Sequence, residues 1–377
     1  MELIYIVNFR IPTERAHGFQ VSKFCEEAAK QGVAVQLVLP ERENRIKNDL
    51  FAFYGLEQNF KVIKLASFDF FKYEKYIGGL AFYLREVSFL IRLFFTGFDK
   101  KAVIYTRNSE IAWLFSWRGF RTVFEAHNWP EHKGWLLRFF LKKVEKIVCN
   151  SSGTEHELQK QGFMSTLTAP NGVDLKKFAL AGSQEEWRRE LSLLVDKKIA
   201  MYLGHLYDWK GADGVVEAAN ILKQNENLLF VLVGGTNEDI KKYKELMEQK
   251  KLDNILFCGY QPPETVPKYL KCADILLLPN SANKKESVLY TSPIKMFEYM
   301  ASGRPIIASD LPSIRAILNE SNCVFFQADN PKSLAEKIGT LLADSALADK
   351  LSGQALADIK TYTWGKRAIN ILSFINS

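Results

Sequence analysis

Lys295 and Glu298 are the two residues of the segment SPIKMFEYMASGRPIIASD, residues 292–310, that are best placed to do chemistry. They lie three residues apart in a predicted helix that is otherwise apolar, so their side chains share one helical face. The Lys295 ammonium could meet a phosphate, and the Glu298 carboxylate could accept two hydrogen bonds from a vicinal diol such as a ribose. The alternative is a surface ion pair without a ligand, which would contribute little.

The start of this predicted helix is a second candidate for anion binding. Ser292 is predicted as the N-cap and Pro293 as the first helical residue, where a missing N–H costs nothing. The amides that follow, from Ile294 onward, would attract a phosphate together with the helix dipole. Gly303 ends the helix, and residues 305–308 form an apolar run typical of a strand covered on both faces.

The segment GHLYDWKGAD, residues 204–213, follows another predicted strand and supplies cations. Gly204 would allow a ligand close to the backbone, while His205 and Lys210 could face a diphosphate. The alternative interpretation of Lys210 is a solvated lysine in a loop. This segment alone is therefore a weak signal.

Two segments of the N-terminal half add further candidates. In NFRIPTERAHGFQ, residues 8–20, Gly18 lies at the start of a predicted helix, where free N–H groups attract phosphate; the alternative is an ordinary tight loop. This segment lacks G-x-G-x-x-G, which disfavours an NAD-dependent dehydrogenase. In FEAHNWPEH, residues 124–132, His127 ends a predicted strand and is either functional or structural.

The sequence does not indicate a metal site. His127 and His132, with Glu125 and Glu131 nearby, lack H-E-x-x-H spacing. The chain also contains no D-x-D, so a metal-clamped diphosphate is not indicated. We therefore expect no metal and no other cofactor, with an anionic ligand met by lysine, histidine and helix ends.

Strands and helices alternate along the chain, which predicts an α/β fold with two doubly wound parallel sheets. A turn-rich connection near residues 171–184 separates two series, so we expect domains at residues 1–180 and 181–361. Ligands bind such sheets at the carboxyl ends of the strands. The candidate segments would therefore converge on one cleft if the two domains face each other. The predicted strands cover residues 3–7, 33–40, 61–66, 102–107, 121–127, 146–151, 166–170, 198–205, 228–235, 255–260, 273–280, 305–310 and 323–328.

The composition limits the class of protein. The 377 residues carry a net charge of +7, which fits an anionic ligand or a membrane surface, and no dense Lys/Arg cluster supports nucleic-acid binding. Five scattered cysteines and an N-terminus without signal-peptide features predict a cytoplasmic protein with reduced thiols. Three charges interrupt the most hydrophobic segment, residues 78–98, which argues against a spanning helix. We expect this segment to be a buried helix, with a helix lying on a membrane as the alternative.

The chain resembles the GT-B glycosyltransferases of family 4, a group of retaining enzymes that use nucleotide sugars. The resemblance covers almost the whole chain and implies two Rossmann-like domains facing across a cleft, with the last helix, about residues 362–377, returning to the first domain. It rests on the combination of the glycine loop before the first helix, APNGVD at 169–174, W-K-G at 209–211, FCGYQPPETVPKYLKCADILLLP at 257–279, SPIKMFEYMASGRPIIASD and the terminal W-x-K-R-A helix.

The resemblance implies three catalytic candidates. Glu298 matches the second Glu of the family's E-x7-E motif, which binds the nucleotide ribose. Lys210 matches the lysine that holds the diphosphate, and His127 matches the histidine that contacts the donor sugar.

The resemblance also implies a set of donor-binding residues. Gly18 matches the loop glycine near the phosphates, and Tyr260 and Gln261 lie where backbone atoms meet the nucleobase. The full set is Gly18, Gly204, His205, Lys210, Tyr260, Gln261, Ser292, Pro293, Ile294, Lys295 and Glu298.

Two positions depart from the family pattern. Tyr290 stands where the first Glu of E-x7-E is expected, although a branch of the family with S-P-[LI]-K-x-F-E-Y-M-A also lacks that Glu. His205 stands where an arginine usually follows the glycine, which leaves one fixed charge fewer for the diphosphate.

The resemblance implies sugar transfer from a nucleotide diphosphate sugar to an acceptor hydroxyl, with retention of configuration, in the synthesis of a cell-surface glycan, polysaccharide or glycolipid. The acceptor would be a glycan or a lipid-linked molecule. The aromatic, basic segments at residues 89–95 and 134–146 would then suit peripheral contact with the inner face of a membrane. A sugar-nucleotide epimerase on the same fold and a non-catalytic nucleotide-sugar-binding protein remain as alternatives.

Overall fold

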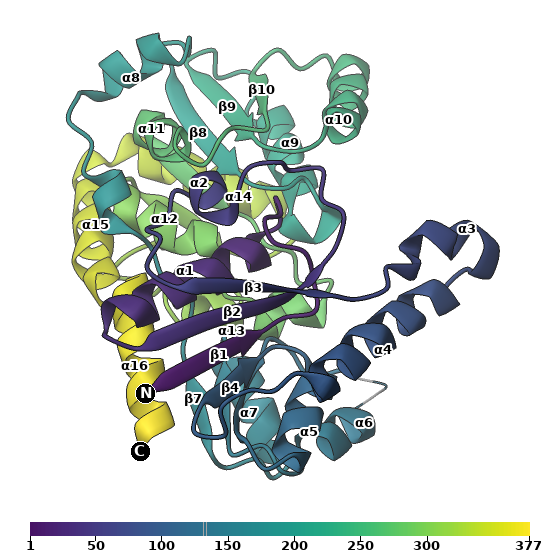
Figure 1. Cartoon of the computed structure of the whole chain (residues 1–377). Coiled ribbons are helices and arrows are strands. Elements are labelled where there is room, and N and C mark those ends of the chain that lie inside the picture. Colours follow the sequence, from purple (N-terminus) through teal and green to yellow (C-terminus); the bar gives the residue numbers. More distant parts are fainter. Residues whose placement is uncertain (131, 133) are drawn as a thin grey trace. The chain divides into compact units, whose positions relative to one another are not determined.

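The computed structural model describes residues 1–130, 132 and 134–377. The chain forms two compact units (Figure 1). Unit 1 contains Met1–Pro170 and Trp364–Ser377, and unit 2 contains Asn171–Thr363. Each unit has its own parallel sheet covered by helices, so the predicted α/β architecture of two doubly wound sheets is confirmed.

The sheet of unit 1 has seven parallel strands, and β1 lies between β2 and β4. Its strands are mostly apolar runs without alternation, because helices cover both faces. In sheet order the strands are β3 (Lys61–Ala66), β2 (Ala34–Glu41), β1 (Glu2–Ile6), β4 (Val103–Thr106), β5 (Arg121–Ala126), β6 (Lys146–Cys149) and β7 (Thr166–Thr168). The helical elements are α1 (Ala16–Lys30), α2 (Leu50–Tyr54), η1 (Phe70–Tyr73), α3 (Glu74–Ile77), α4 (Leu80–Phe95), α5 (Ser109–Trp117), α6 (Gly134–Leu141), α7 (Ser152–Lys160) and α16 (Trp364–Asn376).

The sheet of unit 2 has six parallel strands, and β8 lies between β9 and β11. In sheet order the strands are β10 (Ile255–Gly259), β9 (Leu228–Val233), β8 (Lys198–Leu203), β11 (Ile275–Leu278), β12 (Ile306–Ser309) and β13 (Val324–Phe326). The helical elements are η2 (Leu175–Phe178), α8 (Gln184–Glu190), η3 (Asp208–Lys210), α9 (Ala212–Ile221), α10 (Asn237–Lys250), α11 (Val266–Cys272), η4 (Glu286–Tyr290), α12 (Ile294–Ser302), α13 (Pro312–Arg315), α14 (Pro331–Ala343), α15 (Ser345–Asp358) and η5 (Ile359–Thr361).

The order of strands reverses at β1 in unit 1 and at β8 in unit 2. In open α/β sheets the crevice at such a reversal, beyond the carboxyl ends of the strands, is where ligands bind. The chain leaves β1 through residues 7–15 and β8 through residues 204–211, and the candidate segments 8–20 and 204–213 include most of these connections.

The division between the units differs from the predicted boundary at 180. Unit 1 ends at Pro170, because the chain that follows already packs in unit 2. Val173 bridges Thr363 and belongs, with Phe178, to the core of unit 2. The last helix, α16, packs on α1 of unit 1, as the resemblance implied.

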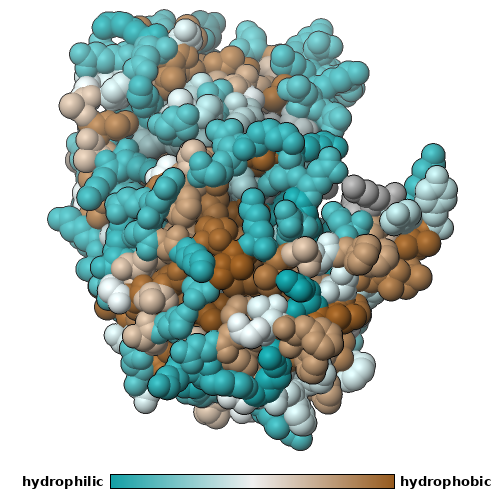
Figure 2. All heavy atoms as spheres, viewed as in Figure 1, coloured by the Kyte–Doolittle hydropathy of each residue, from teal (hydrophilic) through white to brown (hydrophobic). Residues whose placement is uncertain are grey.

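The expectation of burial for residues 78–98 is wrong. This segment forms α4, which buries Ala81, Phe89 and Leu93 but leaves other large apolar side chains exposed. Figure 2 shows brown side chains on the part of unit 1 that α4 forms. The exposed residues of α4 are Leu80, Phe82, Tyr83, Val87, Ile91, Phe94 and Phe95. Among the described residues, no helix combines the length and apolar character needed to span a bilayer.

Candidate functional site

Glycines lie at the carboxyl ends of three neighbouring strands of unit 2. Gly204 follows β8, Gly234 follows β9 and Gly259 ends β10. The Gly204 N–H donates to Val233 O at 2.9 Å, and the Gly234 N–H donates to Gly259 O at 2.7 Å. A Cβ on Gly234 would lie 2.3 Å from Gly204 O, and its φ of 116° also requires glycine. The strand ends therefore present bare backbone, which a ligand can approach closely.

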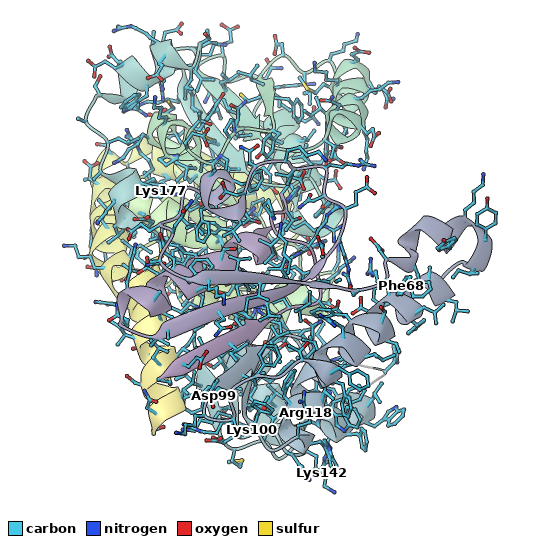
Figure 3. The ribbon with its side chains drawn as sticks, in the orientation of Figure 1. Phe68, Asp99, Lys100, Arg118, Lys142 and Lys177 are labelled. Carbon is cyan, nitrogen blue, oxygen red and sulfur yellow. The ribbon has the colours of Figure 1, made fainter. Side chains whose placement is uncertain are left out.

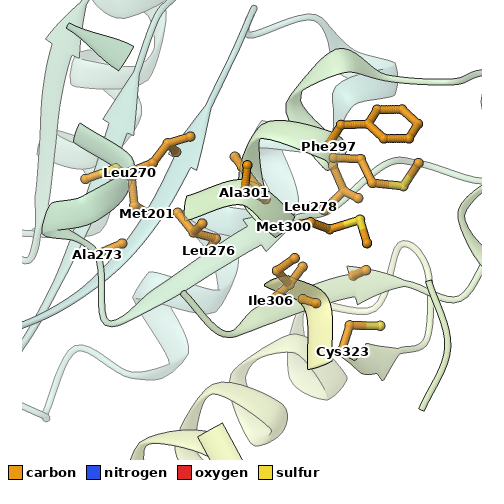
Figure 4. Packing of buried hydrophobic residues seen from close by; sticks show 14 of the residues in the cluster. Met201, Leu270, Ala273, Leu276, Leu278, Phe297, Met300, Ala301, Ile306 and Cys323 are labelled. Carbon is orange, nitrogen blue, oxygen red and sulfur yellow. The ribbon is translucent and has the colours of Figure 1, made fainter. Parts of the chain in front are cut away.

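Helix α12 is fastened to this edge by one buried tyrosine. The Tyr299 hydroxyl accepts from the Leu203 N–H at 2.8 Å, at the end of β8, and donates to Leu277 O at 3.3 Å in β11. Phe297 and Met300 fill the core on the buried side of the helix (Figure 4). The apolar residues of the segment thus fix where Lys295 and Glu298 lie.

The predicted N-cap of α12 is wrong by one residue. Pro293, not Ser292, is the N-cap, and the helix begins at Ile294. The Ser292 hydroxyl instead accepts from the Asn171 N–H at 3.1 Å, and Ser292 O accepts from the Asn171 amide. No side chain in the described ranges caps the N-terminus of α12. The first-turn amides therefore keep the capacity to bind an anion.

Lys295 is buried, which excludes the alternative of a surface ion pair with Glu298. Its Nζ lies 4.1 Å from the centre of the Tyr202 ring and has no hydrogen-bond partner among the described residues. Burial holds the pKa of Lys295 well below its usual range; repulsion from Lys210 acts in the same direction, and Glu298 opposes both. A buried, unpartnered ammonium is costly unless an anion joins it.

Glu298 is half-buried on the same helix, four residues after the half-buried Ile294. Burial raises the pKa of Glu298 to about 7, against the opposing charges of Lys177 and Lys295. Figure 3 labels Lys177, which lies on η2, an element that packs against α12. In the part of the chain that the structure describes, no hydrogen bond or ion pair occupies the Glu298 carboxyl group, so it can accept from a diol.

Lys210 lies at the end of η3, just before α9. Its Nζ lies 3.7 Å from the centre of the Trp209 ring, and burial lowers its pKa to about 8. A Cβ on Gly211 would lie 1.7 Å from Pro279 O, so this position accepts glycine alone. The W-K-G motif thus combines a ring that supports the ammonium with a glycine that lets η3 approach β11.

The remaining candidates of unit 2 occupy the same sheet edge. The rings of His205 and Tyr207 stack with centroids 5.0 Å apart, and His205 O accepts from the Tyr202 hydroxyl at 2.6 Å. Tyr260 is 63% exposed after β10, and the Gln261 side chain donates to Cys258 O at 2.7 Å.

Tyr290, at the position of the family's first Glu, is buried in the helical turn η4, which has π-type hydrogen bonding. Because its side chain is a phenol, this position offers no carboxylate to a ligand. Unit 2 brings together Gly204, Lys210, Lys295 and Glu298; the roles assigned to them from the resemblance stay predictions.

In unit 1, the carboxylate of Glu125 on β5 is fully buried, and both of its oxygens accept hydrogen bonds. Arg107 and Arg367 each donate to Oε1 at 2.8 Å. Tyr105 and Tyr5 donate to Oε2 at 2.8 and 3.2 Å. These contacts satisfy the charge of Glu125 and hold its pKa well below the usual range, despite the opposing effect of burial.

His127 is held by this buried carboxylate. Its Nε2 lies 3.2 Å from Glu125 Oε1, so Nε2–H donates and Nδ1 is left as an acceptor. Burial, followed by the charge of Arg107, lowers the pKa of His127. The same two causes lower the pKa of nearby His17 to about 4. Both imidazoles are therefore neutral near pH 7.

Gly18 has a packing role in unit 1. A Cβ at this position would lie 2.2 Å from the Tyr54 hydroxyl and 2.5 Å from a Thr13 carbon. Its N–H donates to Arg15 O at 3.1 Å. The predicted contact of Gly18 with phosphates stays a prediction.

The conceivable metal cluster of the sequence analysis has one member, Glu131, outside the described residues. Glu125 is occupied by arginines and tyrosines, as described above. Within the described ranges, no three His, Cys, Asp or Glu residues form a group able to hold a metal ion.

Sequence reasoning missed several residues that position the site. Tyr299 was visible only as an aromatic residue of an apolar helix, and Arg107 and Arg367 gave no local signal. Arg367 lies 242 residues from Glu125, so only the returning helix α16 brings the two together. Lys177 follows the APNGVD motif, which was the one available pointer to it.

Two family descriptions match the chain. Glycosyltransferase Family 4 matches residues 19–177, and Glycosyl transferases group 1 matches residues 183–357. Together with the two parallel α/β sheets, these matches define a GT-B glycosyltransferase. The chain belongs to glycosyltransferase family 4.

The curated relatives match only part of this chain, at 25% and 31% sequence identity. An uncharacterized glycosyltransferase of Methanocaldococcus jannaschii, MJ1607, is 25% identical over 61% of this chain and 57% of its own length. The N,N'-diacetylbacillosaminyl-diphospho-undecaprenol alpha-1,3-N-acetylgalactosaminyltransferase of Campylobacter jejuni is 31% identical over 51% of this chain and 48% of its own length. The chain thus spans about half the length of the curated relatives it matches.

A solved structure shares the fold. Anabaena Alr3699/HepE, determined in complex with UDP, aligns over 100% of both chains with a TM-score of 0.75 and 14% sequence identity. This likeness establishes the fold alone, since the identity is low.

Proposed function

We propose that this protein is a retaining glycosyltransferase that moves a sugar from a nucleotide diphosphate sugar to an acceptor hydroxyl. The observation that carries the proposal is the buried, unpartnered ammonium of Lys295 beside Glu298 and Lys210 at a glycine-lined sheet edge. This arrangement suits a ligand that brings an anion and a diol together, as a nucleoside diphosphate does.

In this proposal unit 2 binds the donor. Lys210, Lys295 and the uncapped start of α12 hold the diphosphate, and the Glu298 carboxylate accepts from the ribose hydroxyls. Charge grows on the diphosphate as the glycosidic bond breaks, so the same cations stabilise the transition state more than the ground state. The family resemblance, not the geometry, supports retention of configuration.

In this proposal unit 1 contributes His127 and the binding site for the acceptor. Glu125 fixes the ring and tautomer of His127 and leaves its Nδ1 as an acceptor, which suits the contact with the donor sugar that the family resemblance implies for this residue. The acceptor is a glycan or a lipid-linked molecule, in the synthesis of a cell-surface glycan, polysaccharide or glycolipid. We also propose that the reaction needs no metal, because Lys210 and Lys295 would supply the positive charge that the diphosphate requires.

The exposed apolar side of α4 supports peripheral contact with a membrane. Phe94 and Phe95 are 52% and 77% exposed at the end of this helix. Arg118 lies over the Phe94 ring at 5.5 Å and donates to Leu93 O at 3.2 Å. A cation beside exposed aromatic rings suits the interface of an anionic bilayer.

Thermal unfolding with UDP, GDP, ADP, CDP, TDP and their sugars tests the donor site. A ligand at about 100 times its Kd adds about 2.7 kcal/mol to the stability of the folded state. We expect a selective shift that Glu298→Ala abolishes and that Glu226→Ala, a change of an exposed carboxylate elsewhere in unit 2, preserves. Product analysis then separates transfer from epimerisation. No shift with any nucleotide in the intact protein would contradict the proposal.

A further inference from the structure

Two adjoining cavities of unit 1 suggest what kind of acceptor the protein takes. A groove of about 1150 Å³ runs along α4, and a pocket of about 720 Å³ lies beyond the carboxyl end of β1. Arg42, Glu43 and Asp69 line both, so the two cavities form one continuous surface.

The groove is mainly apolar. Leu84, Val87, Ile91 and Phe95 line it from one face of α4, because they are spaced by three or four residues. Phe68 faces it from the segment that follows β3 and is 77% exposed (Figure 3). An open apolar groove of this size fits a hydrocarbon chain.

The pocket carries an excess of positive charge. Five arginines and three carboxylates line it, and His17 is neutral because burial lowers its pKa to about 4. Arg10, Arg15 and Arg45 are exposed, and their guanidinium groups form no ion pair with any described residue. The residues of each sign are Arg10, Arg15, Arg42, Arg45 and Arg85, and Glu14, Glu43 and Asp69.

Arg42 stands where the two cavities meet. Its side chain is 5% exposed, and its Nη2 lies 3.9 Å from Glu86 Oε1, which also pairs with Arg85 at 3.3 Å. Its Nη1 donates to Asn8 O at 3.0 Å, and its Nη2 donates to Asn8 Oδ1 at 2.6 Å. Its Nε is buried and finds no acceptor in the described part of the chain. Buried donors are nearly always paired, so this atom indicates an acceptor that a ligand would bring.

We propose that the acceptor is an anionic amphiphile, a glycan carried on a lipid phosphate or diphosphate. Its phosphate binds in the arginine pocket, and the adjoining part of its lipid chain lies in the groove along α4. Guanidinium groups suit this role because they bind phosphate oxygens in pairs. This inference rests on the proposed transferase function and narrows its acceptor class from glycans in general to lipid-linked phosphates.

Flotation of the full chain with phosphatidylcholine vesicles that carry a polyprenyl phosphate tests the inference. The comparison vesicles carry the neutral polyprenol or phosphatidylglycerol. We expect the polyprenyl phosphate vesicles to bind about tenfold to thirtyfold more tightly than the polyprenol vesicles. Arg10→Gln/Arg45→Gln should remove this difference, whereas Lys223→Gln/Lys350→Gln, which removes the same charge from unit 2, should preserve it.

A matched pair of variants tests the role of the groove. Ile91→Ser should weaken binding to polyprenyl phosphate vesicles, and Ile221→Ser, at a similarly exposed isoleucine on α9, should not. Equal binding to phosphatidylglycerol vesicles would overturn the inference, because it would show surface charge alone. Full competition by inorganic phosphate at equal concentration would also overturn it, because the lipid would then add nothing.

Failure of this inference is distinguishable from failure of the proposed function. The thermal shift with nucleotide sugars depends on unit 2, and the arginine variants should leave it unchanged. A retained nucleotide shift without preference for polyprenyl phosphate would refute the acceptor class alone. Absence of any nucleotide-induced shift in the unaltered protein would refute the proposed transferase function.

Discussion

Unit 1 and unit 2 differ in how the buried charge at their candidate residues is paired. In unit 1, two arginines, two tyrosines and a histidine surround the carboxylate of Glu125. In unit 2, the buried ammonium of Lys295 has an aromatic ring beside it and no hydrogen-bond partner among the described residues. The satisfied charge makes a rigid support for His127, while the unsatisfied charge favours binding of an anion. The comparison separates residues that position from residues that bind.

The largest effect on catalysis should follow removal of a binding cation. Lys210→Ala is expected to lower kcat/KM for transfer by about 10²- to 10³-fold, because it removes a charge that faces the developing negative charge on the diphosphate. Lys223→Ala, at an exposed lysine of the same unit, should change it little. Steady-state kinetics with a saturating acceptor measure both variants, and equal activity of both would place the diphosphate elsewhere.

Breaking the satisfied network of unit 1 should affect stability and catalysis together. Glu125→Gln leaves Arg107 and Arg367 buried without their anion, which should cost about 3–5 kcal/mol. Denaturant unfolding measures this loss. The control Glu145→Gln removes a surface partner of Arg121 and should cost about 1 kcal/mol or less.

The same Glu125→Gln variant separates positioning from binding. Below the temperature at which it unfolds, its kcat should fall while its Kd for the free nucleoside diphosphate stays unchanged, since the diphosphate and the ribose are assigned to unit 2. A parallel loss of nucleotide affinity would end the contrast between the two units.

The pH dependence of donor affinity should reflect the shifted groups of the donor site in unit 2, among which Lys295, whose pKa burial also lowers, adds to the loss at alkaline pH. Burial raises the pKa of Glu298 to about 7 and lowers that of Lys210 to about 8. Donor binding needs the carboxylate and the ammonium, so affinity should rise as pH increases through 7 and fall above 8. Below pH 7 the loss approaches tenfold per pH unit, or about 1.4 kcal/mol. Calorimetry with a nucleotide sugar measures this change in affinity. A free nucleoside diphosphate is less suitable, because its terminal phosphate titrates near pH 6 and would add its own pH dependence.

In that experiment Glu298→Gln should remove the acid limb and leave the alkaline limb in place. An affinity that does not change between pH 6 and 9 would contradict the assignment of either group to the donor.

The smallest effect should be a gain in stability. Lys295→Met removes a buried cation that the ligand-free protein does not pair, so unfolding at pH 7 should cost about 1 kcal/mol more. Because the folded-state pKa of Lys295 is depressed, the gain should shrink as pH rises toward the usual lysine pKa of about 10.4. Thermal unfolding at two pH values checks the sign, and the variant should also lose the shift given by nucleotides.

The two series of strands, and the residues that end them, can be read from the amino-acid sequence alone. Apolar runs such as those of β9 and β12 predict a sheet covered on both faces. Gly303 ends α12 at the predicted position. The sequence also named Lys210, Lys295 and Glu298, because a charge in an apolar or glycine-rich stretch is a local signal that needs no partner to be noticed.

Which charges are satisfied depends on packing between residues that are distant in the sequence. Ser292 is a good N-cap by type, yet its hydroxyl bonds Asn171 from the start of unit 2, and that competitor lies 121 residues away. The exposure of α4 likewise could not be read from its hydrophobicity, because an apolar helix is buried only where another element covers it. Arg367 reaches Glu125 only because the last helix returns to unit 1. Burial and pairing depend on neighbours that are distant in sequence, whereas helix ends, strands and glycine turns depend on neighbours that are adjacent.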